Sequence, residues 1–162
     1  MVKDSDLIGK RAPSLELPSI PNGDLYRLPI GEKPIALFFF PAANTPGCTR
    51  EACSFRDAQV ENITFKRNPN LVVVGISGDA TTKQSSFADQ YKLPYPILSD
   101  ITNEARKLYG VGKAFLGLTP GRETFFIDDK GIIKGVCDKS IDVNGHIKFV
   151  EKHLLELEKE NK

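Results

Sequence analysis

Residues 35–40, IALFFF, form an uninterrupted apolar run of strand length that ends at Pro41. A run without alternating polar positions is typical of a strand that is buried on both faces of a sheet. A segment with few helix-breaking residues follows from Thr45 to Asn68, and residues 71–77, LVVVGIS, form a second run of the same kind. This order of strand, helix and strand predicts a parallel βαβ unit and therefore an α/β fold.

The remaining segments extend this unit in both directions. We expect an N-terminal β-hairpin (14–18 and 25–28), a helix (81–91) capped by Thr81 or Thr82, a short strand (97–98), a second short helix (102–109), a glycine-rich loop (110–121), another β-hairpin (124–128 and 132–137) and a closing helix (144–159). The order predicts a central mixed β-sheet flanked by helices, which is the thioredoxin-like fold. With 162 residues and 40% hydrophobic content, the chain fits a single domain, 1–162, with a hydrophobic core.

The helix after the first apolar run is expected to continue to just before Asn68-Pro69. Helical spacing then places Ala52, Phe55 and Ile63 near one face. In α/β sheets, ligand sites lie beyond the carboxyl ends of the strands. The segment 41–48, between the first strand and this helix, is therefore the expected location of the functional site.

Charge and composition exclude several classes of partner. The net charge is +1, from 22 basic and 21 acidic residues spread along the chain, which leaves no extended basic surface for nucleic acid or an anionic membrane. No apolar run reaches the roughly 18 residues of a membrane span, and the start, MVKDSDLIGKRAP, lacks the apolar segment of a signal peptide. Three cysteines are too few for a disulfide-stapled secreted domain. We therefore expect a soluble, cytoplasmic protein, or one in the nucleus or in an organelle after removal of a transit peptide.

Cys48 lies at the expected start of the helix. Threonine is a good N-cap and proline is favoured at the first helical position, so Thr45, Pro46 and Gly47 place Cys48 at position N3. Unpaired backbone N–H groups and the helix dipole favour an anion at this position, and therefore a thiolate. We expect Cys48 to be a nucleophile, the alternative being an inert buried thiol.

Cys53 follows five residues later in the same helix. A rise of about 1.5 Å and a rotation of about 100° per residue put the two Cα atoms roughly 8 to 9 Å apart, on different faces. A disulfide needs Cα atoms within about 7 Å. If the two cysteines form a disulfide, the first turns of the helix must unwind.

The sequence around these cysteines resembles a known family. The pattern Pro41-x-x-x-Thr45-x-x-Cys48, followed by Ala52-Cys53-x-Phe55-Arg56-Asp57, is similar to the active-site signature of peroxiredoxins, and the second cysteine resembles that of the peroxiredoxin Q, or bacterioferritin-comigratory-protein, subfamily. The likeness continues in Gly75-Ile-Ser-Gly-Asp79, Leu93-Pro94-x-x-x-Leu98-Ser99-Asp100 and Gly121-Arg122-x-Thr124-Phe125-x-Ile127-Asp128, and so covers nearly the whole chain. It implies a thioredoxin-like fold and a thiol-dependent peroxidase that reduces hydrogen peroxide and organic hydroperoxides in antioxidant defence.

The resemblance also implies roles for individual residues. Cys48 would attack the peroxide and become a sulfenic acid. The hydroxyl of Thr45 and the backbone N–H groups at Gly47 and Cys48 would bind the reacting groups, and Pro41 would shield the thiolate from water. Arg122 would supply a fixed positive charge.

The choice of Arg122 rests on the resemblance, because spacing alone cannot select one of the basic residues. Arg56 and Glu51 remain alternatives that could equally form surface pairs on the helix.

Cys53 would then condense with the oxidised Cys48 to give a disulfide, which a thioredoxin or glutaredoxin-like donor would reduce. The alternative for Cys53 is a core cysteine, and we expect Cys137, in a predicted strand, to be a core thiol. This chemistry requires no metal, haem or flavin cofactor. The subfamily likeness favours a monomer.

Three other patterns give weak signals. His146 and His153 share a face of the last helix, but their spacing and that of Cys48 and Cys53 do not match a structural zinc site. Residues 110–113 lack the complete P-loop spacing, and residues 75–78 are only a weak candidate for a phosphate-binding loop.

Two other functions remain open. A general disulfide oxidoreductase would share the fold, but such enzymes favour a Cys-x-x-Cys spacing that a single helical turn can hold. A non-enzymatic binding or chaperone module is a third possibility, suggested by the Pro-Gly loops and charged termini.

Overall fold

The computed structural model describes residues 2–114, 119–139 and 142–162. Among these residues, seven strands form one mixed sheet in the order β2-β1-β5-β4-β3-β8-β9. The strands are β1 (Glu16–Ser19), β2 (Asp24–Arg27), β3 (Ile35–Phe39), β4 (Val72–Ser77), β5 (Ile97–Ser99), β8 (Glu123–Ile127) and β9 (Ile133–Cys137). The helices are η1 (Asp4–Leu7), α1 (Pro46–Glu61), α2 (Ile63–Arg67), α3 (Thr81–Tyr91), α4 (Glu104–Leu108) and α5 (Val143–Glu160).

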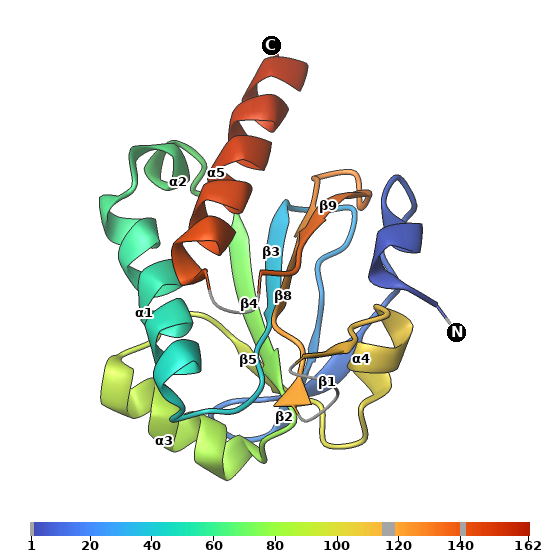
Figure 1. Ribbon diagram of the computed structural model, residues 1–162. Helices are drawn as coiled ribbons and strands as arrows, with labels where there is room; N and C mark the ends of the chain where they lie inside the picture. The colour runs from blue at the N-terminus through green and yellow to red at the C-terminus, as the bar shows by residue number, and fades with distance from the viewer. Residues whose placement is uncertain (1, 115–118, 140–141) are drawn as a thin grey trace.

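Strand β3 lies at the centre of the sheet, parallel to β4 and antiparallel to β8. Alternate residues of β3, together with Phe40 just after it, belong to two separate cores. Ala36, Phe38 and Phe40 pack with residues of α1, α3 and α5. Ile35, Leu37 and Phe39 pack with residues of α4 and the N-terminal segment. Figure 1 shows these helices on opposite sides of the sheet, which explains why every residue of β3 is buried and apolar.

The carboxyl ends of β3, β4 and β5 lie at the same end of the sheet, because these strands are parallel. Asp79, just after β4, accepts hydrogen bonds from the backbone N–H of Ala43 at 2.7 Å and from the hydroxyl of Ser77 at 2.8 Å. Asp100, just after β5, accepts from the backbone N–H of Ala105 at 2.9 Å and thereby fixes the start of α4. The loop that precedes Cys48 is therefore held at the carboxyl ends of the parallel strands, where α/β folds place their sites.

The predicted order of elements is confirmed over the described residues. The N-terminal hairpin pairs β1 with β2, the βαβ unit is parallel, and β8 and β9 form the second hairpin. The glycine-rich loop contains a pair of two-residue strands that the sequence does not predict, β6 (Lys113–Ala114) and β7 (Thr119–Pro120); residues 115–118 of this loop lie outside the described residues.

The helix predicted to continue to just before Asn68 is instead broken at Asn62, and this part of the prediction is wrong. Asn62 has extended backbone angles (φ −78°, ψ 123°), and its side chain accepts hydrogen bonds from the N–H groups of Thr64 and Phe65 as the N-cap of α2. The break changes the helix direction, so Ile63 is 68% exposed instead of sharing the buried face with Ala52 and Phe55.

The boundaries of two further helices differ from the expectation. Helix α3 begins at Thr81 with Ala80 at the N-cap position, so neither Thr81 nor Thr82 caps it. Helix α4 is shorter than predicted, because Asn103 before it adopts a left-handed conformation with φ 61°. The last helix matches its prediction, and Val150 on it is fully buried.

Candidate active site

Cys48 occupies the third position of α1, as predicted from the local sequence. Its side chain is 1% exposed. Thr45 stands at the N-cap position, but its side chain makes no capping hydrogen bond; its hydroxyl donates to the carbonyl oxygen of Ala42 at 2.8 Å. The sequence predicted the position of Thr45 correctly and its capping contact wrongly. No side chain of the described residues therefore caps this helix start, which leaves its N–H groups for an anion.

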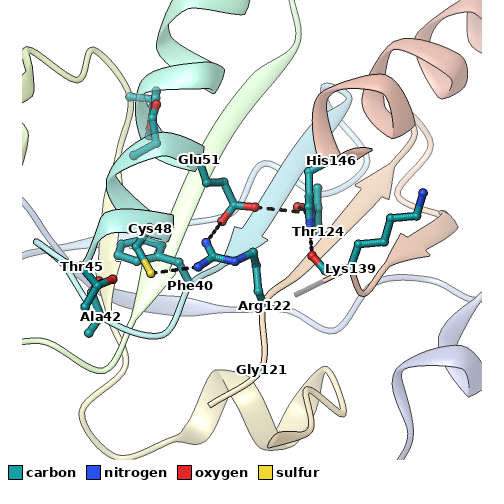
Figure 2. Close-up of polar contacts among 12 residues, drawn as sticks. Phe40, Ala42, Thr45, Cys48, Glu51, Gly121, Arg122, Thr124, Lys139 and His146 are labelled. Carbon is teal, nitrogen blue, oxygen red and sulfur yellow. Dashed lines mark hydrogen bonds and ion pairs between the residues drawn. The ribbon is translucent and has the colours of Figure 1, made fainter. Parts of the chain in front are cut away.

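Arg122 lies beside the sulfur atom, although 74 residues separate it from Cys48 in the chain. Its Nη2 donates to Cys48 Sγ at 3.4 Å, and its Nη1 donates to Glu51 Oε1 at 2.8 Å (Figure 2). Its side chain is only 7% exposed. The guanidinium group thus faces a carboxylate on one side and the thiol on the other.

The two alternatives to Arg122 have other surroundings. Glu51 is fully buried and pairs with Arg122, so the expectation of a surface pair is wrong for it. Arg56 does pair at the surface, with Asp57 at 2.9 Å, and its Nη1 donates to the carbonyl oxygen of Tyr91 at 2.6 Å.

Glu51 is also in contact with His146, a contact that the sequence did not reveal. Glu51 Oε2 lies 3.4 Å from His146 Nδ1, which is also 2.7 Å from the hydroxyl oxygen of Thr124. His146 Nε2 lies 2.7 Å from the carbonyl oxygen of Lys139. Burial raises the pKa of Glu51 to about 7, although Arg122 beside it acts in the opposite direction. Burial likewise lowers the pKa of His146.

Two signals in the sequence could have indicated this contact. Glu51 follows Cys48 by one helical turn and so lies on the same face of α1. His146 shares the buried face of α5 with Val150 and Leu154, where a polar residue needs a partner.

Arg106 of α4 is a second residue that sequence reasoning missed. Its Nη2 donates to the carbonyl oxygen of Phe40 at 3.0 Å, and its Nη1 donates to that of Gly121 at 3.1 Å. Arg106 therefore connects the end of β3, which leads to Cys48, with the residue before Arg122. A short helix with mixed charges is typical of a solvated surface, so its sequence contains no signal for this role.

Gly121 is further fixed by the loop before it. Its N–H donates to the carbonyl oxygen of Gly112 at 2.8 Å, and a Cβ atom at Gly121 would lie 2.5 Å from that oxygen. The close approach explains why glycine precedes Arg122.

The other two cysteines lie apart from this cluster. Cys48, Cys53 and Cys137 all carry free thiols. Cys53 is partly exposed, and burial raises its pKa. Cys137 is 7% exposed in β9, which confirms the prediction of a core thiol. Pro41 is half-buried and follows the last paired residues of β3.

The weaker motifs have structural explanations. A Cβ atom at Gly75 would lie 2.9 Å from the ring of Phe38, so this glycine in β4 makes room for an aromatic core. His153 stacks on Phe126 with ring centroids 5.3 Å apart, away from the contact between His146 and Glu51.

In residues 2–114, 119–139 and 142–162, no three His, Cys, Asp or Glu side chains are grouped as metal ligands. Nor does this part of the chain contain a helix with the length and apolar character needed to span a membrane.

Residues 8–136 of the chain match the AhpC/TSA family. The chloroplastic peroxiredoxin Q of Sedum lineare is 43% identical over 115 residues, which make up 71% of this chain and 60% of that protein. The chloroplastic peroxiredoxin Q of Arabidopsis thaliana is 41% identical over 111 residues, 68% of this chain and 50% of that protein. The chain thus spans about half of the length of the curated relatives that it matches.

Solved structures show the same likeness. Peroxidoxin BcpB from Mycobacterium tuberculosis superimposes with a TM-score of 0.80 at 34% identity, over 93% of this chain and 97% of that one. Peroxiredoxin Q from Xanthomonas campestris, at 22% identity and a TM-score of 0.75 over 88% of this chain and 90% of that one, shares the fold. These structures confirm the thioredoxin-like fold class. The chain therefore belongs to the AhpC/TSA family, and the two plant relatives compared above are named peroxiredoxin Q.

Proposed function

We propose that this protein is a thiol peroxidase that reduces hydrogen peroxide and organic hydroperoxides, with Cys48 as the nucleophile. The observation that carries the proposal is the position of Cys48 Sγ, which lies at the start of α1 and 3.4 Å from Nη2 of Arg122. Both surroundings favour negative charge on sulfur. The similarity to peroxiredoxins of the Q type supports the same activity.

The first step breaks the O–O bond of the peroxide. The thiolate of Cys48 attacks the terminal oxygen, forms an S–O bond and becomes a sulfenic acid, while the departing oxygen takes up a proton and leaves as water or an alcohol. An ordinary thiol is a few per cent ionised at pH 7, so complete ionisation accelerates attack only by roughly 30-fold. The larger part of the acceleration must come from binding the peroxide and stabilising charge on the departing oxygen.

Four groups near Cys48 can supply this stabilisation. Arg122 holds a positive charge beside the sulfur, and the uncapped N–H groups at Gly47 and Cys48 can bind an oxygen atom. The hydroxyl of Thr45, which donates to the carbonyl oxygen of Ala42, can turn towards the substrate. Pro41 limits access of water to the sulfur.

The second step forms a disulfide between Cys48 and Cys53. The thiol of Cys53 displaces the hydroxyl group of the sulfenic acid, and water is released. Both residues lie within α1, at a helical separation of roughly 8 to 9 Å between Cα atoms, so the first turns of the helix must unwind before the sulfur atoms meet. A dithiol donor such as a thioredoxin or glutaredoxin-like protein then reduces the disulfide, and the cycle requires no metal, haem or flavin.

A peroxide-consumption assay tests the nucleophile. Cys48→Ser removes the thiolate, so we expect peroxide consumption to fall by roughly 1,000-fold or more. Cys137→Ser is the matched control and is expected to retain the wild-type rate, because Cys137 lies in the core. Peroxide consumption by Cys48→Ser at the wild-type rate would refute the proposal. Insulin reduction without peroxide turnover would indicate a disulfide oxidoreductase instead.

Mass spectrometry tests the resolving cysteine. After one equivalent of peroxide, the reduced protein should lose two hydrogen atoms, and the linked peptides should contain Cys48 and Cys53. A link between Cys48 and Cys137 would contradict this assignment.

A monomeric state and a cytoplasmic location stay predictions. The curated plant relatives are named chloroplastic, and a reducing organelle would suit the same chemistry.

A further inference from the structure

Glu51 and His146 form a buried contact that the proposed reaction does not use. Both side chains are 0% exposed. Glu51 Oε1 accepts from Arg122, but Oε2 has no hydrogen-bond partner among the described residues, and His146 Nδ1 lies 3.4 Å from it. Figure 2 shows the two side chains pointing at each other from α1 and α5. A buried carboxylate oxygen without a partner is costly, so the contact needs an explanation.

The neighbours of His146 determine where its protons lie. Its Nε2 faces the carbonyl oxygen of Lys139 at 2.7 Å, and a carbonyl oxygen only accepts hydrogen bonds. Nε2 therefore carries a proton. Nδ1 faces Glu51 Oε2 and the hydroxyl of Thr124, which can donate or accept as required.

One additional proton resolves the contact in either of two ways. It can reside on Glu51 Oε2 and point at a bare Nδ1, or it can reside on Nδ1 and point at an ionised Glu51. In both arrangements one proton lies between Oε2 and Nδ1, in addition to the proton on Nε2, and the two side chains together have no net charge. Without that proton, the lone pairs of Nδ1 and Oε2 face each other in a buried site, and the two side chains together have a charge of −1.

This proton affects Cys48 through Arg122, which contacts both the carboxyl group and the sulfur. When Glu51 and His146 hold the proton, the positive charge of Arg122 is not neutralised by them and stabilises the thiolate. When they lose it, their negative charge competes with the thiolate for the same guanidinium group. The thiolate then becomes less favourable.

We propose that His146 is a positioning residue for Cys48: its Nδ1 shares one proton with Oε2 of Glu51, and this proton removes the negative charge that would compete with the Cys48 thiolate for Arg122. The inference rests on the proposed function only in taking Cys48 as the nucleophile. The same sign follows for either location of the proton, because the two groups titrate as a pair.

Other charged groups around Glu51 and His146 shift the proton equilibrium of this pair. Asp142, at the start of α5, and Asp138, after β9, favour a protonated imidazole, whereas Arg122 opposes it. The charge of Glu51 also raises the pKa of the Tyr95 phenol and of the Cys137 thiol. Both groups are neutral at pH 7 and add no charge near the pair. Burial raises the pKa of Glu51 and lowers that of His146, which favours the arrangement with the proton on Glu51.

The test is the pH profile of Cys48 alkylation by iodoacetamide, in a background with Cys53→Ser and Cys137→Ser. His146→Gln keeps a hydrogen-bonding side chain but does not titrate near neutral pH. We expect it to move the midpoint of the profile up by about one pH unit. Glu51→Gln imitates the uncharged carboxyl group, so its midpoint should not rise. His146→Gln should cause no further shift in the Glu51→Gln background.

His153→Gln is the matched control, because His153 lies on the same helix and pairs with Glu156 instead of Glu51. Its midpoint should equal that of the starting protein. An unchanged midpoint in His146→Gln, or an equal shift in the presence and absence of Glu51→Gln, would overturn the proposal. The alkylation readout needs no peroxide turnover, so an inactive protein with the expected shifts would contradict the proposed function and support the role of His146.

A second measurement covers the case in which His146→Gln does not fold. Nitrogen chemical shifts of the imidazole ring in the unsubstituted protein report its protonation directly. We expect Nε2 to carry a proton at pH 7 and Nδ1 to respond to the titration of Glu51. A bare Nε2, or an Nδ1 shift that is the same in wild type and Glu51→Gln, would refute the inference.

Discussion

Gly47 determines whether Arg122 can reach Cys48. A Cβ atom at Gly47 would lie 2.9 Å from Nη2 of Arg122, the same nitrogen that donates to the sulfur. The backbone at Gly47 has no left-handed conformation, so space and not backbone geometry requires glycine at this second position of α1. The absence of a side chain is thus part of the site.

Gly47→Ala is therefore expected to impair activity more than stability. The added methyl group displaces the guanidinium group from Cys48, and the loss of one such charged donor costs about 100-fold in kcat/KM. The thermal midpoint should change little, because alanine suits a helix. Peroxide consumption and thermal unfolding of the same sample test both expectations.

Gly112→Ala is a suitable comparison, because a Cβ atom at Gly112 meets nothing within 4 Å. It should leave both quantities unchanged. A Gly47→Ala protein with the wild-type kcat/KM would show that the contact between Arg122 and Cys48 does not contribute to the reaction.

At the scale of the secondary-structure element, a hydrogen bond from Tyr95 holds α1 in its helical form. It reaches the helix at Ala52, which lies between Cys48 and Cys53 in the sequence. The hydroxyl of Tyr95 donates to the carbonyl oxygen of Ala52 at 2.6 Å, one residue before Cys53. The Tyr95 ring is 4% exposed and packs edge-on against Phe38. This hydrogen bond opposes the unwinding that a disulfide between Cys48 and Cys53 requires.

Tyr95→Phe is expected to accelerate disulfide formation after oxidation. It removes one buried hydrogen bond, which costs about 1 kcal/mol of stability and raises the unwound population of the first turns about fivefold. Stopped-flow measurement of disulfide formation, with hydrogen exchange of residues 46–53, checks the change.

The control is Tyr91→Phe. The Tyr91 hydroxyl meets only an exposed contact with Gln90 among the described residues, and its ring still packs against Phe87 after the substitution. If Tyr95→Phe and Tyr91→Phe form the disulfide equally fast, the hydrogen bond to Ala52 does not restrain the helix.

At the scale of the whole molecule, buried acids on separate elements act in the same direction on stability. Burial raises the pKa of Glu51 to about 7, and burial together with the neighbouring Asp4 of η1 raises that of Glu123 to about 8. A raised carboxyl pKa means that the folded state binds the proton more tightly than the unfolded chain. The contribution of these two carboxyl groups to stability is therefore greatest below their unfolded pKa of about 4.5 and is lost as pH rises through their folded pKa values. The buried histidines, whose pKa values are lowered, oppose this only below their ordinary value of about 6.5.

We therefore expect the thermal midpoint to fall by about 5 °C between pH 6.5 and pH 9. Glu123→Gln should reduce this fall, because its amide does not ionise. Glu16→Gln, at an exposed position of β1, should leave it unchanged. Thermal unfolding across this pH range measures the slope, and a slope identical in all three proteins would contradict the assignment to Glu123.

The predictions that the structure confirmed concern features encoded by neighbouring residues. The position of Cys48 at N3 follows from Thr45-Pro46-Gly47, and the buried strands follow from continuous apolar runs. Local reasoning was wrong where two local preferences compete. At Asn62, capping of the next helix outweighs continuation of the first, and at Thr45 the hydroxyl bonds to Ala42 instead of the helix start.

By itself, the sequence determined the order of the elements, the two-sided burial of the central strands and the placement of the nucleophile at a helix start. These depend on periodicity and on capping preferences within a few residues. Only the tertiary structure decided which charges meet at the sulfur: Arg122 reaches Glu51 across 71 residues of chain, and His146 approaches the same carboxyl group from the last helix. The physical reason is that the energy of a charged contact depends on burial and distance, which are set by the packing of whole elements and leave no periodic trace in the chain.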